Sequence, residues 1–262
     1  IPFLANQNRL TFKRVGLIDP LSIEQYCCHD GFVGLKKALK MDSLKIVKEV
    51  LDSGLRGRGG AAFPAGIKWK TVNEASDDKK YVVCNADEGD SGTFADRMTM
   101  EGDPFSLIEG MTIAGIASGA TMGYIYIRSE YPHAIETMEK AILQANKENY
   151  LGESILGTKK NFQLEVRKAA GSYVCGEETA MLESLEGRRG IVRAKPPIPA
   201  LNGLFGKPTV VNNVLTFTSV PLILAKGASF FKNYGIGRST GTLPFQLAGN
   251  IKHGGIYEKA FG

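Results

Sequence analysis

Apolar segments of strand-like pattern alternate with helical segments along most of this 262-residue chain. Runs rich in β-branched and aromatic residues predict strands at 81–86, 123–128 and 162–166. Apolar spacing of helical period predicts helices over 43–51, 104–118, from 132 onward, 177–185 and 213–224. This alternation predicts an α/β layered, Rossmann-like fold with a largely parallel sheet, whose ligands bind beyond the carboxyl ends of the strands.

Proline and glycine mark the expected boundaries. Asp103 before Pro104 predicts a helix start, with the Asp103 side chain as the cap. Three prolines from 195 to 199 predict an extended connector, because proline fixes φ. We expect an N-terminal helical and loop segment, an α/β ligand-binding domain, and the beginning of a truncated second domain after a boundary near 235–241; these parts are 1–65, 66–234 and 235–262.

A glycine-rich loop interrupts this pattern early in the chain. Four glycines fall within residues 54–60, and arginines, Lys68, Phe63 and Trp69 stand in or beside them. Glycine lets backbone N–H groups approach a ligand closely, cations suit phosphate, and aromatic rings suit a flat ring system. The mixture favours a flavin or nicotinamide nucleotide over a metal, a sugar or DNA, with a mobile loop as the alternative.

The same loop does not open an ordinary Rossmann unit. Residues 57–62 fit the G-x-G-x-x-A dinucleotide pattern, which should follow a strand. Here it follows the helix predicted at 43–51, which Gly54 ends. No Walker P-loop pattern occurs either. We therefore expect a nucleotide bound in a different geometry.

Acidic residues follow the strand predicted at 81–86. The segment Asn85 to Asp90 places several carboxylates at that strand end. Such carboxylates suit Mg²⁺ or the hydroxyl groups of a ribose or ribityl chain, and a solvated turn is the alternative. No phosphate-loop lysine accompanies them as a magnesium–nucleotide site would require.

Two more polar pairs precede predicted helices. Glu177 and Glu178 stand before one helix, whose N-terminal dipole they favour even without a ligand. Asn212 and Asn213 stand before another and are candidates for its cap. Together with the glycine loop and the acidic turn, these pairs predict one site rather than four unrelated turns.

Charge and hydropathy exclude some classes of partner. The formal net charge is +5, from 32 basic and 27 acidic residues, and the basic residues are scattered, so we expect no nucleic-acid binding. No apolar run approaches the roughly 18 residues of a membrane span, so direct membrane insertion is not expected. The residues at the start lack the pattern of a secretory signal.

The cysteines predict a reduced, cytoplasmic protein. Cys27, Cys28, Cys84 and Cys175 show no C-x-x-C spacing. Because only three histidines accompany them, we expect no zinc or iron–sulfur site within these residues.

Four long segments resemble a known family. They are GLRGRGGAAFPAGIKW, CNADEGDSGTFADR, GSYVCGEETAMLESLEG and NGLFGKPTVVNNV. With them the chain resembles the flavin-bearing, NADH-oxidising subunit of respiratory complex I and its soluble relatives, from about residue 40 to the end. The residues at 90–92, 186–190 and 242–250 make the chain most similar to the beta subunit of molybdenum-type NAD-dependent formate dehydrogenase.

The resemblance implies an NAD-dependent flavoprotein oxidoreductase subunit and assigns roles to individual residues. The implied FMN-binding residues are Gly57, Arg58, Gly59, Lys68, Asn85, Asp87, Glu88, Tyr173, Glu177, Asn212 and Asn213. The implied NAD(H)-binding residues are Phe63, which stacks on adenine, Lys68, Asp90 and Glu178. Asp90 and Glu178 are expected to act in catalysis by orienting the nucleotide. Hydride exchange between NAD(H) and FMN would precede one-electron transfer to iron–sulfur centres.

The resemblance also implies parts that these residues lack. Relatives carry a [4Fe–4S] centre in a later C-terminal region and a small α+β domain of ubiquitin-like, SLBB type, which 235–262 would begin. Expected partners are a thioredoxin-like [2Fe–2S] subunit and a catalytic formate dehydrogenase or equivalent subunit. The alternatives are the matching subunit of complex I or of an NAD-reducing hydrogenase, or a non-catalytic nucleotide-binding fragment.

Three positions depart from the complex I pattern. Complex I members usually carry Glu, an aromatic residue and Phe at Asp90, Thr71 and Ile198. All three belong to the nucleotide side, so we expect the stacking on adenine to be weaker or rebuilt.

Overall fold

A four-stranded parallel sheet forms the centre of the molecule, which the computed structural model describes over residues 7–262. Its strands, in the spatial order β3-β2-β1-β4, are β1 (Tyr81–Ala86), β2 (Met122–Ile127), β3 (Gln163–Lys168) and β4 (Thr209–Asn213). The three predicted strands and the parallel sheet are confirmed. Strand β4 was not predicted, because its valines lie between a proline and the paired asparagines.

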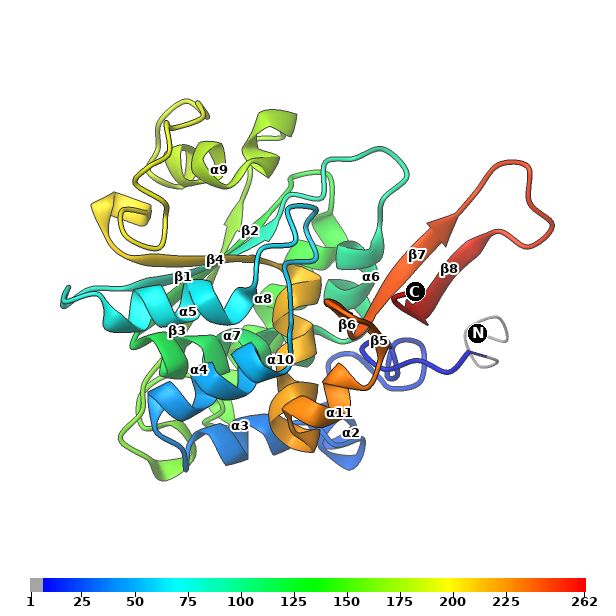
Figure 1. Cartoon of the computed structure of the whole chain (residues 1–262), viewed down its shortest axis with the longest axis horizontal. Helices are drawn as coiled ribbons and strands as arrows, with labels where there is room; N and C mark the ends of the chain where they lie inside the picture. The colour runs from blue at the N-terminus through cyan, green and yellow to red at the C-terminus, as the bar shows by residue number, and fades with distance from the viewer. Residues whose placement is uncertain (1–6) are drawn as a thin grey trace.

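Helices cover both faces of the sheet (Figure 1). The N-terminal part contributes α2 (Ile23–Cys28), α3 (Val33–Ala38), α4 (Ser43–Asp52) and α5 (Ala65–Glu74). The helices that follow are α6 (Ala95–Gly102), α7 (Pro104–Ser118), α8 (Pro132–Lys147), α9 (Glu178–Leu185), α10 (Val214–Lys226) and α11 (Ala228–Lys232). Three 3₁₀ turns are η1 (Ile155–Gly157), η2 (Tyr173–Gly176) and η3 (Leu204–Gly206). The predicted helices, which are α4, α7, α8, α9 and α10, are confirmed. No individual helix was predicted at α2, α3, α5, α6 or α11.

Strand β1 shows how the two faces are filled. Val82 and Cys84 point into the larger core, which they share with α4, α5, α7, α8 and α10. Val83, one residue out of phase, points into a smaller core with Met181 and Leu182 of α9. Both cores are fully buried at these positions. Strand β1 is thus apolar on both faces, as expected for a strand inside a parallel sheet.

Helix α7 is buried along its whole length. Its predicted start at Pro104 is confirmed, but the predicted cap is wrong: the Asp103 carboxylate makes no cap hydrogen bond and instead accepts one from Arg14 Nε at 2.8 Å. The buried guanidinium competes for this side chain more strongly than a neutral backbone amide does. Among residues 7–262, neither α7 nor any other helix has the length and apolarity needed to cross a membrane.

Two short antiparallel pairs follow the sheet domain. They are β5 (Gly235–Ile236) with β6 (Ser239–Thr240), and β7 (Thr242–Leu247) with β8 (Gly255–Ala260). The hairpin of β7 and β8 extends from the body of the molecule beside the N-terminal segment (Figure 1). The assignment of 235–262 to a second domain, and the division at residue 65, stay predictions.

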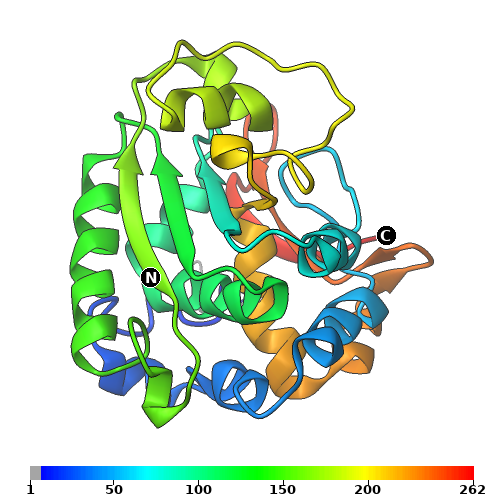
Figure 2. The same cartoon turned by 90° about the vertical axis from the view of Figure 1, so that its left-hand side faces the viewer.

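The order of the strands creates a crevice at one edge of the sheet. The chain proceeds outward from β1 to β2 and β3, then returns to place β4 on the other side of β1. Helices and loops diverge above the carboxyl ends where the order reverses, and ligands of open α/β sheets bind at such a point. The register there sets Asn85 beside Asn213 and Cys84 beside Asn212. Figure 2 shows α9 and the connector after it above these strand ends.

Candidate functional site

The glycine loop projects over this crevice from the α4–α5 connection. Gly57 N donates to Phe63 O at 2.8 Å, and Ala65 N donates to Leu55 O at 2.9 Å, so the base of the loop is closed. At the tip, the amides of Gly59, Gly60 and Ala61 have no acceptor among the residues that the structure describes. These N–H groups are therefore available to a ligand.

Glycine permits one close approach of the loop to β4. A Cβ added to Gly59 would lie 3.1 Å from Asn213 Cβ, tighter than an ordinary contact. A side chain here would also enter the space between the loop and β4. The loop thus keeps its backbone close to the strand end, as a phosphate or ring edge would require.

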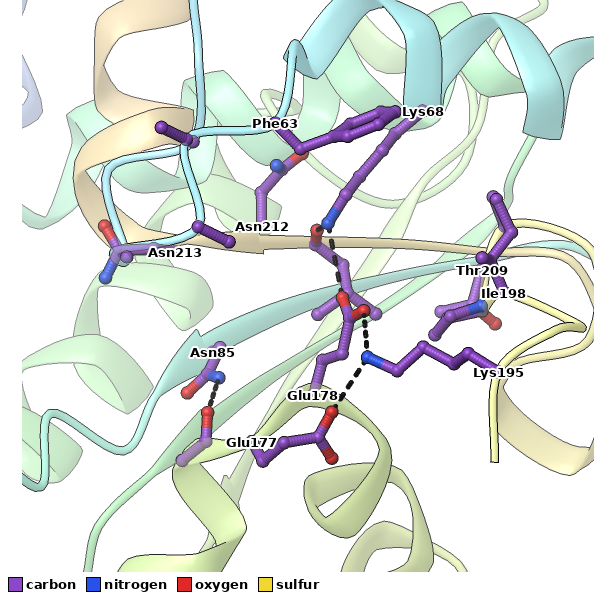
Figure 3. Close-up of a pocket in the computed structure, with 18 residues that line it drawn as sticks. Phe63, Lys68, Asn85, Glu177, Glu178, Lys195, Ile198, Thr209, Asn212 and Asn213 are labelled. Carbon is purple, nitrogen blue, oxygen red and sulfur yellow. Dashed lines mark hydrogen bonds and ion pairs between the residues drawn. The ribbon is translucent and has the colours of Figure 1, made fainter. Parts of the chain in front are cut away.

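A cavity of about 460 Å³ lies between the loop, β4 and α9, within the usual size range of ligand sites (Figure 3). Nine residues predicted for the site line it: Gly57, Gly59, Phe63, Lys68, Asn85, Glu177, Glu178, Asn212 and Asn213. They come from distant parts of the sequence and meet here because β1 and β4 are neighbours.

A second cavity of about 730 Å³ adjoins the first. The predicted residues Arg58, Glu88, Asp90 and Tyr173 line it, and Gly59, Asn85, Glu177 and Asn213 line both. Asn85 Nδ2 donates to Gly176 O at 2.8 Å between the two spaces. Asp87 lines neither space, so thirteen of the fourteen predicted site residues line the paired cavities.

Asn212 and Asn213 make different hydrogen bonds. Asn213 Oδ1 accepts from Leu215 N at 2.9 Å, so Asn213 caps α10, as one interpretation of the sequence had it. Its Nδ2 donates to the buried Asp96 Oδ2 at 2.6 Å. Asn212 Oδ1 accepts from the indole Nε1 of the buried Trp69 at 2.9 Å. Both amides are fixed from behind while they border the cavity.

A chain of alternating charges crosses the first cavity (Figure 3). Lys68 Nζ lies 3.2 Å from Glu178 Oε2 and donates to Val211 O at 3.1 Å. Lys195 Nζ lies 2.9 Å from both Glu177 Oε1 and Glu178 Oε1. In the sequence, Lys195 belongs to the predicted connector 195–199, which was grouped with the asparagine pair, but Lys195 itself was given no binding role. The two adjacent glutamates were the signal for it, since paired carboxylates at a partly buried site need cations.

Glu177 is a helix cap as well as a cavity residue. Its Oε2 accepts from Thr179 N at 2.7 Å and Ala180 N at 3.0 Å, at the start of α9. Burial acts to raise its pKa, but hydrogen bonds from Thr179, Lys195 and the α9 amides prevail and lower it. Glu177 is therefore a fixed anion, and the helix-dipole interpretation holds for this member of the pair.

The acidic turn after β1 supplies three different carboxylates. Asp87 is buried, and burial raises its pKa to about 6, against the lowering effect of Arg128. Glu88 accepts from Asp96 N at 2.8 Å and Arg97 N at 3.0 Å, so it caps α6. Asp90 is exposed and accepts from Tyr173 OH at 2.9 Å.

Arg58 extends away from the glycine loop. Its backbone N donates to Thr216 Oγ1 at 2.9 Å, and its Nη2 donates to Thr240 O at 2.7 Å. The guanidinium also lies 4.6 Å from the ring centre of Phe261. Burial, with the nearby Arg56, lowers its pKa to about 10. Arg58 thus joins the glycine loop to the C-terminal hairpin.

No cluster of three or more metal-ligating side chains occurs within residues 7–262, and the four cysteines are free thiols. Free loop amides, two lysines and ordered amide side chains instead fit a phosphate-bearing ligand, and the exposed Phe63 fits a flat ring. Fold and cavity together define a nucleotide-binding α/β protein whose glycine loop follows a helix.

Comparison with known proteins specifies this class. The model of the Nuo51 FMN-binding domain matches residues 50–222, and the chain belongs to this family. The chain is 49% identical over 256 residues to the NADP-reducing hydrogenase subunit HndC of Solidesulfovibrio fructosivorans, covering 98% of this chain and 52% of that protein. It is 44% identical over 245 residues to an NADH-quinone oxidoreductase subunit of Escherichia coli strain K12, covering 93% and 55%.

Solved structures agree with this assignment. The crystal structure of an NAD⁺-reducing [NiFe]-hydrogenase in the air-oxidized state matches with a TM-score of 0.80 and 34% sequence identity. The match covers 97% of this chain and 41% of that one. The chain thus spans about half the length of the curated relatives it matches.

Proposed function

We propose that this chain is the FMN-bearing part of an NAD(H)-oxidising or NAD⁺-reducing flavoprotein subunit. The observation that carries the proposal is the paired cavity, in which free glycine-loop amides, Lys68 and the tandem asparagines face one space. Bound FMN would supply the redox chemistry, which is hydride exchange with NAD(H) and one-electron transfer onward.

The residues that would hold FMN line the paired cavities. The amides of Gly59 and Gly60 and the ordered side chains of Asn212 and Asn213 offer hydrogen bonds to phosphate. Asn85 offers further polar contact at the boundary of the two spaces. The side chains of Asn212 and Asn213 are held in place by contacts behind the cavity, so little of their side-chain entropy is lost on binding.

The residues that would hold NAD(H) line the first cavity. Phe63 is 43% exposed and offers a face for adenine, while Lys68 and Lys195 offer positive charge to the pyrophosphate. Glu178, between the two lysines, fixes both cations and can accept from a ribose hydroxyl. At the complex I departures, Ile198 lines the cavity, whereas Thr71 Oγ1 donates to Ile67 O.

The assembly is a separate part of the proposal. The segments at 90–92, 186–190 and 242–250 favour the beta subunit of an NAD-dependent formate dehydrogenase. The 49% identity to a hydrogenase subunit favours a hydrogenase, and complex I relatives are close behind at 47% and 44%. In each case iron–sulfur subunits would receive or deliver the electrons, and the free thiols support the cytoplasmic location predicted from the sequence.

Two measurements test the proposal. The purified chain should bind FMN on titration, with quenching of flavin fluorescence, and NADH should then bleach the bound flavin under anaerobic conditions. Failure to bind FMN would contradict the assignment of the cavity. For the assembly, subunits that co-purify with the full-length protein should support NAD⁺ reduction by formate; reduction by hydrogen only would replace formate dehydrogenase with hydrogenase.

A further inference from the structure

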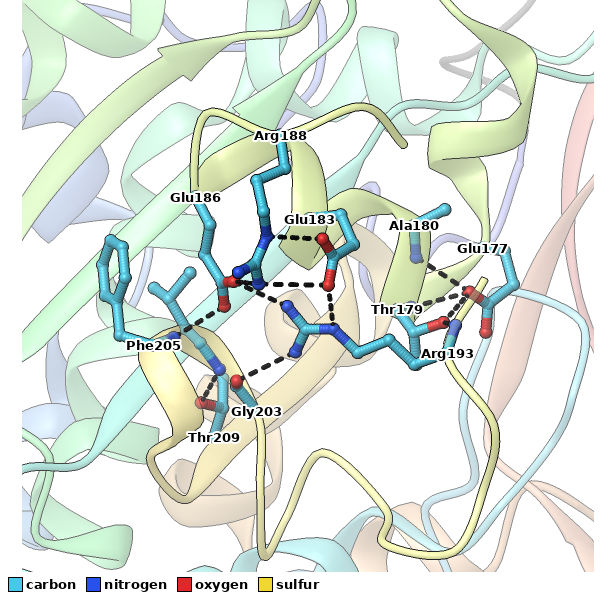
Figure 4. A network of polar contacts seen from close by, with 11 residues as sticks. Glu177, Thr179, Ala180, Glu183, Glu186, Arg188, Arg193, Gly203, Phe205 and Thr209 are labelled. Atoms are coloured by element: carbon cyan, nitrogen blue, oxygen red, sulfur yellow. Dashed lines mark hydrogen bonds and ion pairs between the residues drawn. The ribbon is translucent and has the colours of Figure 1, made fainter. Parts of the chain in front are cut away.

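An irregular connector, residues 188–199, follows α9 and borders the nucleotide side of the cavity. Near its end, Lys195 contacts both Glu177 and Glu178, and Ile198 and Pro199 form part of the cavity wall. Because the connector contains no helix or strand, its position depends on side-chain contacts. Figure 4 shows the network that supplies them.

Arg193 is the centre of that network. Its Nε donates to Glu183 Oε1 at 2.5 Å and its Nη2 to Glu186 Oε2 at 2.8 Å. Glu183 lies in the last turn of α9, and Glu186 directly follows the helix. Its Nη1 donates to Gly203 O at 3.1 Å, beyond the connector. The Arg193 side chain is 24% exposed, and the fixed fork of its guanidinium joins three acceptors at once. One side chain thus fastens the connector to α9 and to the turn before η3.

The backbone of Arg193 reaches the cavity by another route. Its N–H donates to Thr179 Oγ1 at 2.8 Å, and that hydroxyl donates to Glu177 Oε2 at 2.5 Å. Thr179 is 2% exposed, so no solvent competes for these bonds. The other oxygen of Glu177 accepts from Lys195. The position of Arg193 is therefore coupled through Thr179 to the same carboxylate that Lys195 contacts.

We propose that Arg193 is a positioning residue for NAD(H) binding. It holds the connector on α9 so that Lys195 stays between Glu177 and Glu178 and Ile198 stays in the cavity wall. Arg193 does not line either cavity itself, so it acts through these neighbours. Of the groups assigned to FMN, Gly59 and Asn213 have no contact with Arg193 among the described residues, and Glu177 is linked to it only through Thr179. This inference rests on the proposed function.

Arg188 provides a matched control within the same network. It donates to Glu183 Oε2 at 2.6 Å and also contacts Glu186, so it shares both carboxylates with Arg193. Its side chain is 60% exposed, and within residues 7–262 it contacts neither Gly203 nor Thr179. Its removal takes away the same charge without releasing the later part of the connector.

The test compares Arg193→Ala, Arg193→Lys and Arg188→Ala in the FMN-loaded full-length protein. The readouts are FMN content, the NAD(H) dissociation constant, and the rate of thermolysin cleavage beside Ile191 and Val192, which are exposed. Arg193→Ala should weaken NAD(H) binding roughly tenfold and accelerate cleavage, with FMN retained. Arg193→Lys should be intermediate, because an ammonium cannot match the guanidinium fork. Arg188→Ala should resemble the wild type.

Several outcomes would overturn the inference. Faster cleavage of Arg193→Ala with wild-type NAD(H) affinity would make Arg193 an anchor without influence on the nucleotide. Equal losses of affinity in Arg193→Ala and Arg188→Ala would assign the effect to charge alone. If Arg193→Ala loses FMN, the test depends on Arg193→Lys instead. An NAD(H) affinity equal to that of the wild type in Arg193→Lys would then overturn the inference. A wild-type protein that holds FMN but binds no NAD(H) contradicts the proposed function itself and removes the inference with it.

Discussion

At the scale of single residues, Lys68 is the cation that joins α5 to the acidic side of the cavity. Its Nζ contacts Glu178 and the carbonyl of Val211. We expect Lys68→Ala to weaken FMN or NAD(H) binding by about 10- to 100-fold, because the variant loses a positive charge beside the ligand and leaves Glu178 with one cation fewer. Fluorescence titration of the purified protein measures this.

Lys226 is the control for that prediction. It is exposed in the last turn of α10 and lines neither of the paired cavities. Lys226→Ala should therefore leave both affinities unchanged. Equal titration curves for the two variants would contradict the assignment of Lys68 to the site.

Asp87 predicts a pH dependence of stability. Burial raises its pKa to about 6 in the folded protein, whereas an unfolded aspartate ionises near its ordinary 3.8. Between these values the folded state binds more protons, so this group's contribution to the free energy of unfolding falls as pH rises through that window. Asp87→Asn removes this titration. Its free energy of unfolding, relative to that of the wild type, should therefore rise by about 1–2 kcal/mol from about pH 4 to about pH 7.

Urea unfolding of the FMN-free protein at about pH 4 and at about pH 7 checks this prediction. The informative quantity is the change with pH of the difference between Asp87→Asn and the wild type, since other titrating groups cancel in it. A difference that stays constant between the two pH values would contradict the raised pKa.

At the scale of elements, the contact between α7 and α3 depends on one buried carboxylate. Glu109, inside α7, accepts from Phe32 N at 2.8 Å and Leu35 N at 2.9 Å, which belong to the start of α3. It also accepts from Tyr26 OH at 2.6 Å. Glu109→Ala leaves these donors buried without an acceptor and should lower the free energy of unfolding by about 3–5 kcal/mol.

Denaturant unfolding measures the effect, with Glu136→Ala as the control. Glu136 lies on the exposed side of α8 and pairs with Lys140 one turn later, so its removal should change the midpoint little. A small effect at Glu109 would show that α3 finds other partners for its first amides.

Elements with a strong local pattern were predicted from the sequence, and those that depend on distant contacts were not. Strand β1 was predicted with its observed bounds, because Tyr81 to Ala86 is a largely apolar run. Helix α6 was missed, since its sequence is largely polar and its first amides are capped by Glu88 from another segment. Lys195 was missed for a similar reason: its partners are distant in sequence, and only the fold brings them together.

At the scale of the whole molecule, Glu258 of β8 fastens the N-terminal segment to the C-terminal hairpin. Glu258 is 4% exposed, and its carboxylate accepts from Leu10 N at 2.7 Å, Thr11 N at 2.8 Å and Phe12 N at 3.1 Å, and from Thr242 Oγ1 at 2.5 Å. Glu258→Ala should accelerate amide exchange in this segment and lower the free energy of unfolding by about 2–4 kcal/mol.

Hydrogen–deuterium exchange followed by mass spectrometry measures this opening. Glu165→Ala, on the exposed face of β3, is the control and should leave exchange at residues 10–12 unchanged. Protection that persists in Glu258→Ala would mean that other contacts hold the two ends of the chain together.

The sequence by itself determined the local chemistry of this protein. It set the strand and helix periods, the glycine loop that follows a helix, and the family to which the chain belongs, because these depend on residues close together in the chain. Only the tertiary structure decided how the segments meet. The return of β4 beside β1 joins Asn85 to Asn213, and the connector brings Lys195 to Glu177. Such contacts arise from packing between distant segments, which no local pattern encodes.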